Sequence, residues 1–99
     1  MAQVAQITLI SPSGVSIKNL VKSALHSELR MIELSLKRTR HNLRDFEQKY
    51  GMSTSEFYQK LTDDDIQETL DFIEWTGEYK TLGKLQNKLQ TLQEIQFAD

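Results

Sequence analysis

The amino-acid sequence predicts an all-α protein, in which two long antiparallel helices form a coiled-coil-like hairpin joined by a short helix. A short β arm is expected at the N-terminus. Three observations support this prediction: a heptad-like apolar repeat, a 35-residue span without glycine or proline, and a helix stop at Gly51. The chain is expected to form one domain, with the arm and turn over residues 1–14 and helices over 15–50, 53–61 and 62–96.

Residues 3–10 have the composition of a short β-strand. Val4, Ile7, Thr8 and Ile10 are β-branched, and the segment ends at Ser11-Pro12. A lone strand leaves its backbone donors and acceptors unpaired. We therefore expect the arm to pair with a second copy, to pair with another protein's sheet, or to stay flexible.

The first long helix is predicted from apolar residues that recur at alternating steps of four and three, with Thr39 in the one polar slot. Ser13 or Ser16 is expected to cap its start. The repeat consists of Leu25, Leu29, Ile32, Leu36, Leu43, Phe46 and Tyr50. A second stripe is either covered by the preceding arm or serves as a second interface; it consists of Ile17, Leu20, Val21, Ala24, Met31 and Leu34.

The clearest break in the helical pattern follows Tyr50. Gly51 is expected to adopt the left-handed conformation that ends a helix, and Ser53 to cap the next one with Glu56 completing a capping box. Met52 and Phe57 stand at the positions of a hydrophobic staple.

A second helix start is predicted at Thr62, with Asp65 reciprocating the cap. The last helix is expected to run from about Asp63 to Ile95. Its core face is expected to include Ile66, Leu70 and Ile73.

Composition favours an elongated helical pair, or an oligomer that shares its core, over a compact single core. Only 38% of the 99 residues are hydrophobic, against roughly 45–50% in typical globular proteins. Residues 1–50 carry eight Lys/Arg and four Asp/Glu, whereas residues 51–99 carry four and ten, so the two halves have opposite charge. We expect a homo-oligomer, either a dimer or a tetramer, in which copies share their apolar surfaces.

Several classes of function find no support in the sequence. There is no cysteine, no apolar run of the roughly 20 residues that span a bilayer, and no signal peptide, so a cytoplasmic location is expected. His26 and His41 stand about 22 Å apart on one helix, and no zinc-binding spacing occurs. We expect no enzyme activity, cofactor, metal or small-molecule substrate.

Three sets of residues are candidates for binding. Nucleic acid would contact a basic run, although the usual explanation of such a run is a solvated surface or pairing with the acidic stretch. The run consists of Lys37, Arg38, Arg40 and Arg44. A partner protein would contact an acidic-aromatic segment, whose aromatics are alternatively core: Asp71, Phe72, Glu74, Trp75, Glu78 and Tyr79. Self-association would use Val4, Ile7, Leu9, Leu29, Ile32, Leu36, Leu43 and Phe46.

Short motifs of this sequence resemble the TumA-like antitoxins that are encoded beside TumE-type toxins in prokaryotes. The motifs are Lys49-Tyr50-Gly51-Met52-Ser53, Glu56-Phe57-Tyr58, Asp71-Phe72-Ile73-Glu74-Trp75 and Tyr79, within residues 40–95. The resemblance implies a non-catalytic protein that binds and neutralises a ribonuclease-like toxin. Many antitoxins bind operator DNA through a ribbon-helix-helix, but residues 3–35 lack the turn that would divide their helix. The competing interpretations are a self-associating coiled-coil scaffold and a DNA- or RNA-binding regulator.

Overall fold

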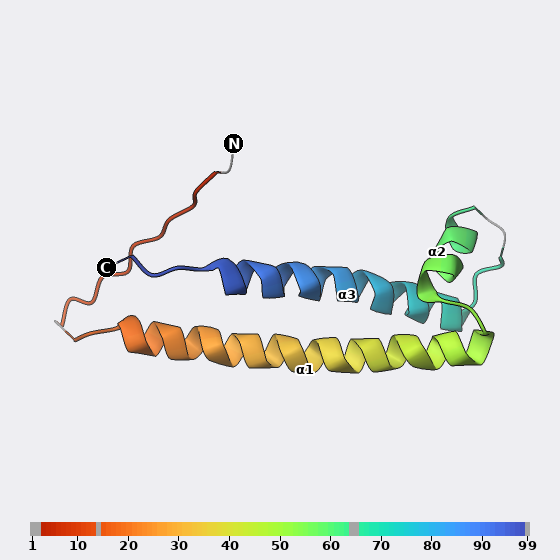
Figure 1. The fold of residues 1–99 in the computed structure, drawn as a ribbon, viewed down its shortest axis with the longest axis horizontal. Helices are drawn as coiled ribbons and strands as arrows, with labels where there is room; N and C mark the ends of the chain where they lie inside the picture. The colour runs from red at the N-terminus through yellow and green to blue at the C-terminus, as the bar shows by residue number, and fades with distance from the viewer. Residues whose placement is uncertain (1–2, 14, 64–65, 99) are drawn as a thin grey trace.

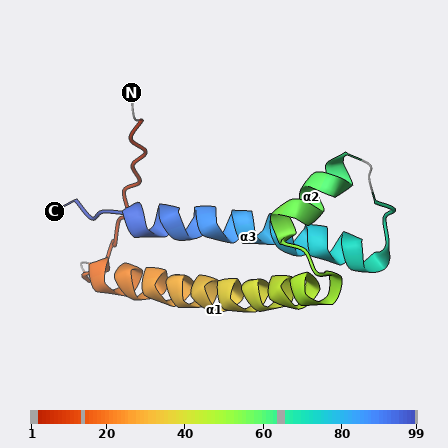
Figure 2. The same ribbon diagram turned by 45° about the vertical axis from the view of Figure 1, so that its right-hand side comes forward.

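Two long antiparallel helices form the protein, as the sequence predicts (Figure 1). The computed structural model describes residues 3–13, 15–63 and 66–98, and these contain three helices and no strand: α1 (Lys18–Tyr50), α2 (Thr54–Thr62) and α3 (Leu70–Glu94). Both views show α1 and α3 side by side, with α2 lying against the hairpin near the end of α1 (Figures 1 and 2). The all-α hairpin is therefore confirmed.

The predicted β arm is not formed within the single chain. Residues 3–10 have no regular secondary structure and project past the end of α3 (Figure 1). Val4, Ile7 and Ile10 are 82%, 87% and 83% exposed. A strand requires a neighbouring strand for its hydrogen bonds, and the described residues of this chain supply none. Pairing with a second chain stays a prediction.

The heptad seam of α1 faces α3. Ile32, Leu36, Thr39 and Leu43 are the buried residues of the helix, so the polar slot lies on the same face as its apolar neighbours. The prediction that a serine caps this helix is wrong. The helix begins at Lys18, and its N-cap residue is Ile17, so no side chain accepts a capping hydrogen bond from the first turn.

The turn between α1 and α2 confirms the predicted stop and start. Gly51 adopts φ 64° and ψ 32°, and its N–H donates to Glu47 O at 2.9 Å. Ser53 Oγ accepts from the N–H of Glu56 at 3.1 Å. Glu47 extends the cap, because its carboxylate accepts from the Thr54 N–H at 2.8 Å. The α2 start is thereby tied to the last turn of α1.

The last helix begins later than predicted. Thr62 ends α2 instead of capping α3, and Asp65 lies outside the described residues. The N-cap of α3 is Thr69, whose Oγ1 accepts from the Phe72 N–H at 3.2 Å. Asp71 already lies beside Lys49 near the end of α1. A helix continued back to residue 62 would project about 12 Å past its companion with nothing to pack against.

The core lies at the α2 end of the hairpin. It is centred on Leu43, Phe57 and Trp75, and Met52 packs against it as the predicted staple requires. The expectation that Leu70 and Ile73 supply the core face is wrong, since they are 81% and 52% exposed. The aromatic residues of α3 occupy that face instead, because α2 offers Phe57 as a stacking partner.

Candidate functional site

The aromatic members of the predicted partner-binding segment hold the fold together. Trp75 is fully buried and stacks on Phe57, with ring centroids 3.9 Å apart. Its Nε1–H donates to Thr54 Oγ1 at 2.9 Å, which satisfies the buried indole nitrogen. Trp75 is therefore a core residue of this chain and exposes no surface to a partner.

Phe72 and Tyr79 flank this core and are half-buried. The Phe72 ring lies 5.1 Å from Tyr50 and 5.2 Å from Phe57, and the Tyr79 ring lies 5.1 Å from Tyr58. The sequence left core and interface open for these aromatics, and the structure assigns them contacts within the chain.

Asp71 joins the acidic segment to α1. Lys49 Nζ donates to its carboxylate at 2.7 Å, and the Tyr50 hydroxyl also donates to it. Hydrogen bonds from Lys49 and then from Tyr50 hold the pKa of the Asp71 carboxyl below its usual range. The hydrogen bond to Asp71 raises the pKa of both donors. Asp71 is thus engaged within the chain.

Beside this pair, α1 and α3 enclose an acidic groove of about 490 Å³ on the side of the hairpin away from α2. Asn42, Asp45 and Phe46 line it from α1, and Glu74, Gly77 and Glu78 from α3. Asn42 donates to Glu78 at 3.2 Å, whereas Glu74 is exposed. In the described part of the chain, no Lys or Arg forms an ion pair with Asp45, Glu74 or Glu78, although His41 Nε2 lies 3.4 Å from the Asp45 carboxylate on α1. Three carboxylates therefore give this groove negative charge.

Most of the predicted self-association residues pack within the chain. Ile32, Leu36 and Leu43 are buried, and Leu29 and Phe46 are half-buried in the seam between α1 and α3. Their heptad spacing serves the intramolecular hairpin. Of the predicted set, the arm residues Val4, Ile7 and Leu9 remain exposed.

The basic run is exposed along α1. Lys37, Arg38, Arg40 and Arg44 are all solvent-accessible, and none of them forms an ion pair with the described acidic residues. The expected pairing of this run with the acidic stretch is therefore absent from the described chain. Lys49, five residues beyond the run, makes that connection instead.

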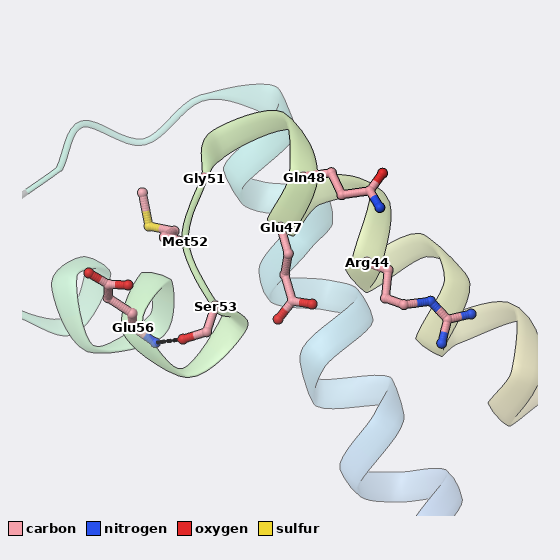
Figure 3. A pocket seen from close by; sticks show the side chains of 7 residues that line it. All are labelled: Arg44, Glu47, Gln48, Gly51, Met52, Ser53 and Glu56. Atoms are coloured by element: carbon pink, nitrogen blue, oxygen red, sulfur yellow. Dashed lines mark hydrogen bonds between the residues drawn. The ribbon is translucent and has the colours of Figure 1, made fainter.

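A hollow of the described surface lies at the turn between α1 and α2 (Figure 3). Its volume is about 530 Å³, and its polar groups come from Arg44, Glu47, Gln48, Ser53 and Glu56. Figure 3 shows the hydrogen bond from the Glu56 N–H to Ser53, which begins α2. Glu47 caps the same helix through the Thr54 N–H. The polar groups of Ser53 and Glu47 are therefore already used to hold the start of α2.

Thr54 is a structural residue that the sequence did not reveal. It is 7% exposed and receives the Trp75 indole hydrogen bond. Its position directly after the Ser53 cap gave no sign of this role, since the contact joins residues 21 positions apart.

Comparisons with known proteins leave the chain without an assigned relative. No protein-family model, curated protein or solved structure matches it.

Within the described residues there is no group of three or more metal-ligating side chains. None of the described helices has the length and apolar character needed to cross a membrane.

Proposed function

We propose that this protein is a non-catalytic interaction module that binds a partner protein through its N-terminal arm, residues 3–10. Its partner is a toxin encoded by a neighbouring gene, which it neutralises in the cytoplasm. The exposure of the arm carries this proposal. Val4, Ile7 and Ile10 all exceed 80% exposure, and no backbone hydrogen bond links residues 3–10 to the rest of the described chain.

The chemistry of the arm suits addition to the edge of a partner's sheet. Strand addition supplies main-chain hydrogen bonds and pockets for alternate side chains. Full burial of one Val or Ile side chain contributes about 1.5–3 kcal/mol. The class of partner, a ribonuclease-like toxin, is supported by the resemblance of residues 40–95 to TumA-like antitoxins.

Co-expression with the neighbouring gene product tests the proposal. We expect a hetero-complex by native mass spectrometry, and growth inhibition when the neighbour is expressed alone. Ile7→Asp should abolish the complex, because it places a charge in the strand that pairs. Leu20→Asp is the matched control, since Leu20 is 71% exposed on α1 and lies outside the arm.

The outcomes separate the parts of the proposal. A neighbour that neither binds nor inhibits growth would refute the antitoxin function. A complex that survives Ile7→Asp would assign binding to a surface other than the arm. Equal loss with Leu20→Asp would also contradict the arm as the specific contact.

Surface area supports a second candidate, a self-associating scaffold. The chain exposes 8207 Å², whereas a compact monomer of 11.5 kDa exposes about 5,800 Å². Its radius of gyration is 19.4 Å, against about 13 Å for a compact domain of this length. A homo-oligomer of defined mass that binds no neighbour would favour this function.

A further inference from the structure

We infer that the face of the hairpin opposite α2, here called the open face, is the interface of a symmetric dimer with a second copy of this chain. The two copies lie face to face with their helices antiparallel. This inference is independent of the arm and of the proposed toxin partner, and it rests on which face is covered and how its charges are arranged.

One face of the hairpin is covered at both ends. At one end, α2 lies beside Arg40 and Arg44 of α1. At the other, the C-terminal residues Ile95 and Phe97 lie beside Lys22 and His26, with Lys22 Nζ 5.3 Å from the Phe97 ring centroid. Lys22 precedes Arg40, and His26 precedes Arg44, by 18 residues or five helical turns. Both covers therefore lie on the same side of α1.

The open face lies on the other side and includes the acidic groove at the α2 end. Residues seven apart lie on nearly the same side of a helix, with a drift of only about 20°. Arg38 precedes Asp45 by seven positions, and Lys84 follows Gly77 by seven. Lys88 follows in the next turn after Lys84, and all three basic residues are exposed. The open face thus has an acidic end and a basic middle.

The two clusters are offset along the hairpin. Lys49 bonds to Asp71 and Asn42 bonds to Glu78, so this register places Lys84 level with Leu36. The basic cluster of Arg38, Lys84 and Lys88 is therefore centred about nine residues, or about 14 Å, from the cluster of Asp45, Glu74 and Glu78.

A two-fold axis perpendicular to both helices, near the level of Arg40, places each acidic cluster opposite the basic cluster of the second copy. The axis lies in the interface and reverses the helix direction, so α1 faces α1 and α3 faces α3 of the second copy. Asp45 then meets the second copy's Arg38, and Glu74 meets the second copy's Lys84. Each contact occurs twice, as an isologous interface requires. Within one described chain, neither Asp45 with Arg38 nor Glu74 with Lys84 forms an ion pair, and Asp45 contacts only His41.

The area of this contact is sufficient for a specific dimer. About 20 residues of each helix overlap, which gives a face about 30 Å long and about 20 Å wide. Two such faces bury about 1,200 Å² in total, at the lower limit of stable interfaces. The product is an antiparallel four-helix bundle, in which a two-helix layer gains the second layer that a closed core needs.

Charge exchange on the full chain tests the dimer by sedimentation equilibrium. The wild type is expected to sediment at twice 11.5 kDa, and less completely at high salt. Glu74→Lys and Lys84→Glu should each weaken dimerisation roughly tenfold or more, because each replaces two attractive contacts by two repulsive ones. Both sites are exposed, so circular dichroism should show an unchanged fold.

Compensation distinguishes the proposed interface from a general charge effect. An equimolar mixture of the two single variants, and the double variant, should both recover the dimer. Glu33→Lys makes the same charge change outside the open face and should leave the dimer intact. A monomeric wild type, a dimer indifferent to both exchanges, or a failure of the mixture to recover would overturn the inference.

Discussion

Replacement of Trp75 by alanine is expected to remove most of the stability of this protein. The side chain has no exposed surface, stacks on Phe57 and lies 5.5 Å from the Phe46 ring. Truncation of a buried Trp typically costs about 3–5 kcal/mol. Loss of the indole donor also leaves the 7%-exposed Thr54 without this hydrogen bond, which adds about 1 kcal/mol. The free energy of unfolding of a typical domain is roughly 5–15 kcal/mol. The variant should therefore be largely unfolded if the wild type lies at the low end of this range.

Urea unfolding followed by far-ultraviolet circular dichroism measures this loss, because the variant has no tryptophan to report by fluorescence. Trp75→Phe keeps an aromatic ring but removes the donor to Thr54, so it should lose about 1–2 kcal/mol. A Trp75→Ala free energy of unfolding within about 0.5 kcal/mol of wild type, as at a surface position, would refute the assignment of Trp75 to the core.

Three further predictions follow from the helices. Leu36→Asp places a charge at a 3%-exposed seam position and should abolish most helical signal; a wild-type spectrum would contradict the seam. Gly51→Ala should lower the free energy of unfolding by about 1–2 kcal/mol, because φ is 64° at this position and the added methyl group meets backbone strain but no neighbouring atom. Gly77→Ala in α3 should raise the free energy of unfolding by up to about 1 kcal/mol. Equal effects of the two substitutions in thermal unfolding would contradict this. The hydrogen bond from Lys49 lowers the pKa of Asp71, so its contribution is present above about pH 4 and lost as pH falls further. The stability difference between wild type and Asp71→Asn should therefore shrink on acidification, and a pH-independent difference would count against the ion pair.

Local signals in the sequence identified the features that depend on neighbouring residues. The seam of α1 follows from spacing alone, since only a helix brings Ile32, Leu36 and Leu43 to one side. The αL stop at Gly51 and the Ser53 cap depend on one or two residues each, and both are confirmed.

The start of α3 could not be chosen from the sequence, because Thr62 and Thr69 both have the chemistry of a cap. Only the position of α1 decides between them: its last turn ends at Tyr50, and helix beyond that level would have no neighbour. The same applies to the core face of α3. From the sequence, either Leu70 and Ile73 or the aromatic residues could form the core face. In the structure Phe57 on α2 stacks on Trp75, so the aromatic residues form it and Leu70 and Ile73 are exposed.

The candidate surfaces depend still more on tertiary structure. The sequence shows that the two halves have opposite charge, but it does not show which charges meet. The register between α1 and α3 pairs Lys49 with Asp71, and in the described chain Glu74 and Lys84 form no ion pair, while Asp45 pairs only with His41 of its own helix. The uneven distribution of charge along the sequence therefore produces a face with complementary acidic and basic clusters only when α1 and α3 pack together.

The arm and the open face are separate surfaces, so both proposals can hold in one assembly. An antiparallel dimer places the two arms at opposite ends of the bundle, because each arm leaves its chain beside the start of α1 (Figure 1). Two partner proteins would then bind far apart without competing, and the native complex would contain two copies of each protein. If the chain is a dimer alone but forms a complex with one copy of each protein, partner binding and dimerisation exclude one another. In that case Glu74→Lys, which opens the dimer, should strengthen the capture of the partner.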